Sequence, residues 1–201
     1  MKIKICGLFR EEDIDYANEA MPDYVGFVFA PSRRQLTAAQ AAALRARLRE
    51  GITPVGVFVD APVERIAALY NEGIFALAQL HGHEDAAYLA ALKRLCPAPL
   101  IKAVRISRDT QHALSMDAVD FFLFDNGAGG TGQTFDWGIL PDLTACLRKP
   151  YFLAGGLNGD NITAALALKP FAIDVSSGAE TNGVKDRGKM LSLVQQVHAW
   201  R

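Results

Sequence analysis

The chain has 201 residues, 50% hydrophobic and 21% charged, so it carries enough apolar surface for a folded core, and long disordered stretches are excluded. Its formal net charge of −1 and its pI of about 6.4 exclude nucleic acid and anionic membranes as the main partner. We therefore expect one compact domain over residues 1–201 that binds a small molecule.

Eight short runs rich in Val, Ile and Phe are predicted to be strands, at residues 3–6, 24–29, 54–59, 76–81, 100–104, 121–124, 151–154 and 172–175. Ala- and Leu-rich segments of helical period alternate with them, at residues 11–19, 38–49, 63–70, 85–95, 137–147, 162–168 and 187–200. Between the predicted fifth and sixth strands only residues 109–115 are left for a helix, which predicts a shortened helix there. Thr37 and Asp160 are the predicted N-caps of the second and seventh helices.

This alternation of strands and helices indicates a parallel sheet, either closed into a barrel or open and doubly wound. Periodicity does not separate the two folds. Glycine-rich segments follow the sixth, seventh and eighth strands, where barrels of one type build a phosphate site. The sequence therefore predicts an α/β fold, a single (βα)8 TIM barrel of the phosphate-binding type.

The first glycine-rich segment, GAGGTGQT at residues 127–134, has Gln133 where a Walker motif needs lysine, which disfavours a nucleotidase. Taken alone, it is equally well explained as a surface loop. Two further segments, at residues 154–159 and 174–179, favour a shared anion site, because glycine lets backbone N–H groups approach a phosphate closely. The residues predicted to bind the phosphorylated substrate in these loops are Gly130, Thr131, Gly132, Gly155, Gly156, Asp174, Ser176, Ser177 and Gly178.

Two residues at strand ends are candidate catalytic groups. Cys6 ends the first strand, where the N-termini of the barrel helices point toward the mouth and can favour a thiolate. Asp125 follows four apolar residues, and a carboxyl group entering a pocket from such a strand can stay protonated near neutrality. The structural alternatives are a buried apolar cysteine, as expected for Cys96 and Cys146, and an aspartate that caps a turn.

Two arginines, Arg33 and Arg34, follow the second strand, and a guanidinium there would suit a substrate carboxylate. Adjacent loop arginines are otherwise commonly solvated. His81 and His83 are the only close histidine pair, and with no carboxylate or thiol completing a site we predict no metal. An odd number of distant cysteines, no CxxC pair and no run of about 18 apolar residues predict an untargeted cytoplasmic protein.

Over essentially its whole length the sequence resembles phosphoribosylanthranilate isomerases of tryptophan biosynthesis, which are (βα)8 barrels. The resemblance implies an Amadori rearrangement without a cofactor, with Cys6 as general base, Asp125 as general acid and Arg34 holding the anthranilate carboxylate. Leu8-Phe9 stands where the resemblance leads us to expect Ile-Thr or Leu-Thr. The motifs that carry it are Lys4-Ile5-Cys6-Gly7, Gly26-Phe27-Val28-Phe29, Ser32-Arg33-Arg34, Val55-Gly56-Val57-Phe58, Gln79-Leu80-His81-Gly82, Gly129-Gly130-Thr131-Gly132, Phe135-Asp136-Trp137, Ala154-Gly155-Gly156-Leu157 and Asp174-Val175-Ser176-Ser177-Gly178.

Two other functions remain possible at this stage. A sibling isomerase of the histidine pathway would need a second phosphate loop in the first half of the chain, whereas the loop at residues 81–85 is acidic. A non-catalytic sugar-phosphate sensor would keep the glycine-rich loops but has no need of both Cys6 and Asp125. The sequence leaves open whether the protein is a monomer or a homodimer.

Overall fold

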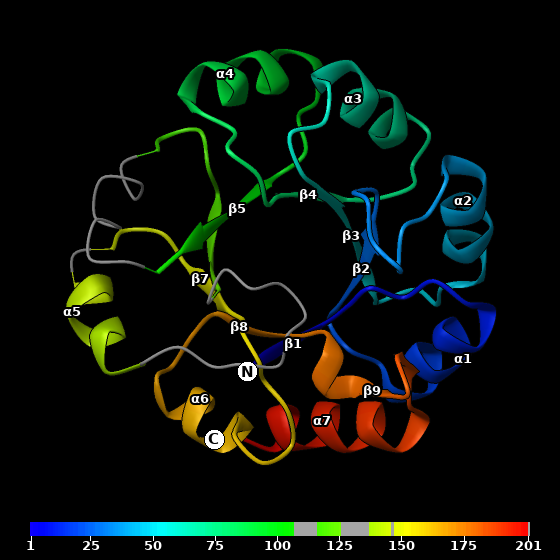
Figure 1. Ribbon diagram of the computed structural model, residues 1–201, viewed down its shortest axis with the longest axis vertical. Helices are drawn as coiled ribbons and strands as arrows, with labels where there is room; N and C mark the ends of the chain where they lie inside the picture. Colours follow the sequence, from blue (N-terminus) through cyan, green and yellow to red (C-terminus); the bar gives the residue numbers. More distant parts are fainter. Residues whose placement is uncertain (107–115, 126–136, 146, 201) are drawn as a thin grey trace.

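Eight parallel strands form a closed barrel in the order β1 to β8, and the helices lie around its outside (Figure 1). The computed structural model describes residues 1–106, 116–125, 137–145 and 147–200. Closure confirms the predicted barrel and excludes the open sheet. The strands are β1 Lys2–Cys6, β2 Tyr24–Val28, β3 Thr53–Phe58, β4 Leu77–Leu80, β5 Leu100–Arg105, β6 Phe121–Asp125, β7 Tyr151–Leu153 and β8 Ala172–Val175.

The helices agree with the predicted ranges to within about two residues in most cases. They are α1 Glu11–Ala20, α2 Ala38–Arg47, α3 Val63–Asn71, α4 Ala86–Leu95, α5 Leu140–Ala145, α6 Ile162–Ala167 and α7 Arg187–Ala199. The predicted helix at residues 137–147 is shorter, because its first turn is the 3-10 helix η2, Trp137–Ile139. The shortened helix predicted at residues 109–115 lies outside the described residues.

A short hairpin after β8 was not predicted. The 3-10 helix η3, Ser177–Ala179, leads into β9, Glu180–Thr181, which pairs antiparallel with β10, Val184–Lys185. Between the two strands, Asn182 and Gly183 both have positive φ, at 52° and 83°. This is the backbone of a two-residue hairpin turn for which Asn-Gly is the preferred sequence, so the signal was present in the chain.

Alternation along the strands divides the core into two parts. Residues such as Ile3, Ile5 and Phe27 point outward and are buried against the helices. Inward-pointing residues, among them Leu123 and Phe152, form a second apolar cluster that fills the barrel toward the amino ends of its strands. Because one end of the barrel is packed in this way, a ligand has access to its interior only from the carboxyl ends of the strands.

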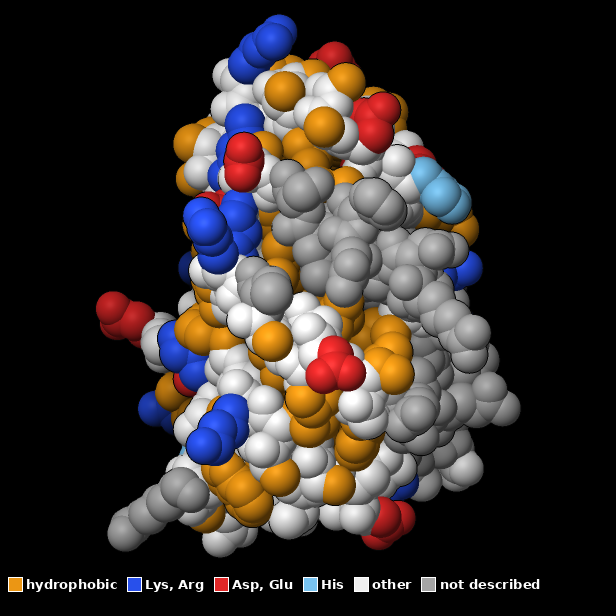
Figure 2. Space-filling view, turned by 90° about the vertical axis from the view of Figure 1, so that its left-hand side faces the viewer, with side chains coloured by type: hydrophobic (Ala, Val, Ile, Leu, Met, Phe, Trp, Pro, Cys, Tyr) orange, Lys and Arg blue, Asp and Glu red, His pale blue; other side chains and the backbone are white. Residues whose placement is uncertain are grey.

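Charged side chains of both signs are interspersed with apolar and neutral ones on the face of the molecule that Figure 2 shows. Among the helices of the described residues, none combines the length and the apolar character that crossing a membrane requires.

Of the two predicted N-caps, Thr37 is confirmed and Asp160 is not. Thr37 caps α2, since its side chain accepts a hydrogen bond from the Gln40 amide while Gln40 bonds back to the Thr37 amide. Asp160 is not a cap, and that prediction is wrong. Its own amide donates to the Asn158 side chain at 2.8 Å, which forms a turn, and the N-cap residue of α6 is Asn161.

Alanine substitutions at these two positions test which of the two residues caps its helix. Thr37→Ala removes the acceptor of a helix N-terminal amide, so we expect it to lower the free energy of unfolding by about 1 kcal/mol. Asp160→Ala keeps the backbone amide that bonds to Asn158, so it should change that free energy by less than about 0.5 kcal/mol. Urea unfolding of both variants measures the difference, and equal losses would contradict the assigned cap.

Candidate active site

A cavity of about 360 Å³ opens at the carboxyl ends of the barrel strands. Its walls come from inward-pointing strand residues and from the loops that follow β2, β7 and β8. Both predicted catalytic residues, Cys6 and Asp125, lie in this one cavity. Other residues that line it are Arg34, Gln79, His81, Arg105, Ala154, Gly155, Gly156, Asp174, Ser176 and Ser177.

Cys6 reaches the cavity because its neighbouring strand carries no side chain beside it. A Cβ built on Gly26 would lie 2.7 Å from the Cys6 Sγ, so only glycine leaves room for the thiol. The thiol is nearly buried, and burial raises its pKa, although the positive charge of Lys4 opposes the rise. The free protein therefore favours the thiol, contrary to our expectation that helix N-termini at the mouth favour a thiolate.

Asp125 lies at the end of β6 with its carboxyl group nearly buried. Its Oδ2 is 3.3 Å from Nε2 of His81, and Nδ1 of His81 is 3.3 Å from Nε2 of Gln79. Gln79 lies on β4 and His81 directly follows the strand, two residues further on, so both point into the barrel. His81 therefore orients the candidate acid, a role that we did not predict although its alternation with Gln79 indicates an inward position.

Arg34 is held over the cavity by Glu180 of the β9–β10 hairpin. Its Nε and Nη2 donate to the two carboxylate oxygens at 2.7 and 2.9 Å, a bidentate arrangement that fixes the plane of the guanidinium. Gly7, with φ of 81°, passes so close that a Cβ there would be 2.4 Å from the Arg34 Cδ. Arg33 also bonds to Glu180, at 2.5 Å, so it is not merely solvated, although half of its side chain is exposed.

The loops after β7 and β8 offer backbone donors to an anion. Gly155 and Gly156 both have positive φ, at 90° and 68°. The amides of these two residues, and those of Ser177 and Gly178, donate to no acceptor within the described part of the chain. A Cβ on Gly178 would be 1.9 Å from the Leu157 carbonyl oxygen, so the two loops touch there.

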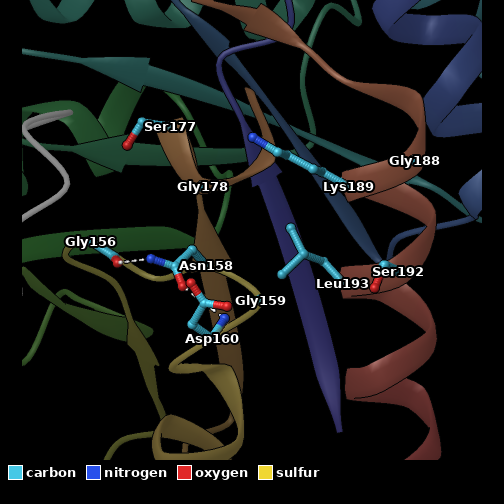
Figure 3. A pocket seen from close by; sticks show the side chains of 10 residues that line it. All are labelled: Gly156, Asn158, Gly159, Asp160, Ser177, Gly178, Gly188, Lys189, Ser192 and Leu193. Atoms are coloured by element: carbon cyan, nitrogen blue, oxygen red, sulfur yellow. Dashed lines mark hydrogen bonds between the residues drawn. The ribbon is translucent and has the colours of Figure 1, made fainter. Parts of the chain in front are cut away.

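A second hollow lies behind these loops, between the loop after β7 and helix α7, with Ser177 and Gly178 above it (Figure 3). It shares Gly156 and Ser177 with the cavity at the barrel mouth. These two residues therefore lie where the hollows meet.

The remaining predictions of substrate-binding residues concern Asp174 and three residues of the first glycine-rich segment. Asp174, predicted to bind substrate, lines the cavity but its carboxylate bonds to Lys4. Gly130, Thr131 and Gly132 lie outside the described residues. Across the described ranges, no three His, Cys, Asp or Glu side chains gather as metal ligands would.

Comparisons with known proteins decide the family. A family described as N-(5'-phosphoribosyl)anthranilate (PRA) isomerase matches residues 3–196. The chain belongs to this family. It is 45% identical to N-(5'-phosphoribosyl)anthranilate isomerase of Endomicrobium trichonymphae over 199 residues, which cover 96% of each chain.

Solved structures agree with this assignment. The crystal structure of phosphoribosyl anthranilate isomerase from Thermus thermophilus has a TM-score of 0.89 and 32% identity, and covers all of both chains. A phosphoribosyl anthranilate isomerase in complex with reduced 1-(o-carboxyphenylamino)-1-deoxyribulose 5-phosphate has a TM-score of 0.84 and 32% identity, with the same coverage. The protein is an isomerase of tryptophan biosynthesis.

The loop after β1 of this isomerase is stabilised without the threonine that we expected. Phe9 stands in its place, and the amides of Phe9 and Arg10 both donate to the Asp13 carboxylate, at 3.0 and 3.1 Å. The Arg10 guanidinium bonds to the same carboxylate and to the carbonyl of Lys185. A carboxylate from the first turn of α1 thus holds the loop that leads away from Cys6.

Sequence reasoning missed Glu180, whose carboxylate has three cationic partners. Besides both arginines it accepts from Lys185 at 2.7 Å. Burial raises the pKa of Glu180, but the bonds from Arg34 and Lys185 outweigh this effect and hold the pKa below its ordinary value. The ionised form is therefore the native one, and it links the loop after β2 to the loop after β8.

This linkage predicts a pH dependence of stability. A carboxyl whose pKa is lower in the folded than in the unfolded state stabilises the fold above its unfolded pKa, and that stabilisation is lost as the pH falls through the folded pKa. Glu180→Gln should therefore reduce the free energy of unfolding at pH 7 and make it fall less steeply below about pH 4.3, the ordinary pKa of glutamate. Glu50→Gln, at an exposed position, is the control for loss of one charge. If both variants keep the wild-type pH profile in denaturant titrations, Glu180 has no such role.

Proposed function

We propose that this isomerase performs the Amadori rearrangement of N-(5'-phosphoribosyl)anthranilate with Cys6 as general base and Asp125 as general acid. The observation that carries the proposal is their convergence in one cavity that also contains Arg34 and the amides of the β7 and β8 loops. These groups match the four parts of the substrate that need recognition or chemistry. They are a phosphate, a carboxylate, a ring oxygen that gains a proton and a carbon that loses one.

The reaction begins at the furanose ring. Asp125 gives a proton to the ring oxygen, the C1–O bond breaks, and the nitrogen lone pair forms a Schiff base with C1. The Cys6 thiolate then removes the proton from C2, and the C–H electron pair neutralises the iminium to give an enolamine. Tautomerisation yields the ketone, and each proton transfer contributes about 10²- to 10⁴-fold to the rate.

Binding at the two ends of the substrate supplies the orientation that these steps need. The phosphate accepts hydrogen bonds from the amides of Gly156 and Ser177, where glycine at positive φ turns the backbone toward the anion. At the other end the substrate carboxylate binds Arg34, whose remaining guanidinium edge is free of the bonds to Glu180. Glu180 thereby fixes the angle at which Arg34 meets its ligand.

The loop after β4 speaks against a substrate with two phosphates. The amide of Gly82 donates to Glu84, and the amide of His83 donates to Asp60 at 2.6 Å. Glu84 is in turn buried against Lys102. Donors that a second phosphate would require are therefore occupied by carboxylates, which disfavours the histidine-pathway substrate. A non-catalytic sensor is disfavoured because it requires neither Cys6 nor Asp125.

The two catalytic residues should fail at different steps. Cys6→Ala keeps the acid, so ring opening survives but C2 keeps its proton, whereas Asp125→Asn produces almost no Schiff base. Each variant should lose more than about 10²-fold in kcat. With a reductant selective for the imine, the Cys6 variant should accumulate reduced open-chain compound and the Asp125 variant should not. Equal trapping, or near wild-type turnover by Cys6→Ala, would show that the roles are assigned wrongly.

The two arginines should differ in their effect on substrate affinity. Arg34→Met removes a charged donor to the carboxylate, so we expect kcat/KM to fall about 10- to 100-fold. Arg33→Met, the matched control, should fall by less than about threefold, within the range of exposed ion pairs. With N-phosphoribosylaniline, which lacks the carboxylate, Arg34→Met and the wild type should have similar kcat/KM. A loss at Arg34 that persists with this analogue would mean that the carboxylate binds elsewhere.

A further inference from the structure

A buried lysine lies inside the barrel directly beneath the catalytic thiol. Strand alternation points Lys4 and Cys6 to the same side of β1, two residues apart, and Lys4 is fully buried. Below it lies the apolar cluster that includes Leu123 and Phe152. Lys4 therefore belongs to the lowest polar layer of the barrel interior, immediately under the cavity.

The lysine is held in place by the last strand. Lys4 on β1 and Asp174 on β8 are register partners, and the Lys4 Nζ is 3.0 Å from each carboxylate oxygen of Asp174. Burial lowers the pKa of Lys4, but the Asp174 carboxylate outweighs this effect and the pKa is raised. The ammonium is consequently a fixed positive charge and cannot itself serve as the base at neutral pH.

A contribution to the stability of the fold does not by itself explain why this buried ion pair is present. Removing two charges from water is costly, and well-packed apolar residues at the same positions are often as stable. The position of this pair is more informative than its energy. Its cation lies next to the group that must become an anion during the reaction.

We propose that Lys4 is a positioning residue that allows Cys6 to act as a base, by placing a fixed positive charge beside the sulfur when it is ionised. Asp174 holds the ammonium at that place, and its negative charge partly cancels the effect of the ammonium on the sulfur. The inference deepens the proposed function and rests on the role given there to Cys6. In the proton transfer from C2 the C–H bond breaks and an S–H bond forms, while Lys4 keeps all its protons throughout.

Other charged groups near the thiol are weaker candidates for this role. The Lys185 ammonium also favours the thiolate, but its direct bonds go to Glu180 and to the Ser176 carbonyl. Among the described residues that line the cavity, the other ionisable groups come from other strands and loops. They are Arg34, His81, Arg105 and Asp125.

The two members of the pair should affect Cys6 in opposite directions. Burial raises the pKa of the thiol most, the charge of Lys4 lowers it, and the charge of Asp174 raises it. Lys4→Met should therefore make the thiol harder to ionise, and Asp174→Asn should make it easier. A pair with only a structural function would disturb the site in the same direction whichever member is lost.

The pH dependence of Cys6 alkylation by iodoacetamide tests this, with the modified peptide quantified by mass spectrometry. Relative to wild type, the midpoint should rise by about one pH unit in Lys4→Met and fall in Asp174→Asn. Lys4→Arg, which keeps the charge, should lie closer to wild type than Lys4→Met. Cys96, fully buried in the core, reports opening of the fold in the same samples. Shifts of the same sign in Lys4→Met and Asp174→Asn, or no shift in Lys4→Met, would overturn the proposal.

Lys4→Met leaves a buried carboxylate without its cation, so a second variant protects the test against misfolding. Lys4→Met/Asp174→Asn removes both charges, and its midpoint should lie above wild type because the lysine has the larger effect on the thiol. A midpoint at or below wild type would contradict the inference. The acidic limb of the kcat/KM profile should move with the alkylation midpoint in each variant. If Cys6→Ala is active, the role of Cys6 as base fails, whereas the alkylation shifts still report on Lys4.

Discussion

Pairing of the first strand with the last is the constraint on which the rest of the structure depends. The β1–β8 register joins residues 2–5 to residues 172–175 and closes the barrel. It brings Cys6 next to the loop after β8, where the Ser176 hydroxyl bonds to the Cys6 carbonyl at 3.3 Å. The proposed base and the proposed phosphate loop are therefore neighbours only because the sheet is closed.

Several charged residues are buried in or beside this barrel. Opposite charges meet as buried pairs, each beside a group that contacts the cavity. Lys4 with Asp174 lies under the thiol, and Glu180 with Lys185 supports Arg34. Glu84 with Lys102 fixes the turn that follows His81. Such pairs keep the polar groups of the site in position before a substrate arrives, which is the condition for electrostatic catalysis.

Much of this arrangement could be predicted from local sequence. Apolar runs and helical periods give the strands and helices, and glycine-rich loops after the last three strands indicate the barrel. Cys6 and Asp125 stand at strand ends, so their place at the mouth follows from the fold. Glycine-rich loops likewise predict that Gly156 and Ser177 lie at the cavity as part of an anion site.

Other features depend on contacts through space that no local pattern records. Lys4 is one of the two lysines that alternate with isoleucine in β1, and only its register with Asp174 shows that it is paired. Glu180 and Arg34 are far apart in the chain and meet through the hairpin after β8. The expected thiolate at Cys6 failed for a similar reason, because burial of the sulfur is a property of the folded interior.

The central claim is the orientation of the substrate across the barrel mouth. A crystal structure of this chain with reduced 1-(o-carboxyphenylamino)-1-deoxyribulose 5-phosphate tests it most directly. We predict the phosphate on the amides of Gly156 and Ser177, the carboxylate on Arg34, and the carbons corresponding to C1 and C2 between Cys6 and Asp125. A ligand bound in the reverse direction, or with its reacting carbons out of reach of both side chains, would contradict the account.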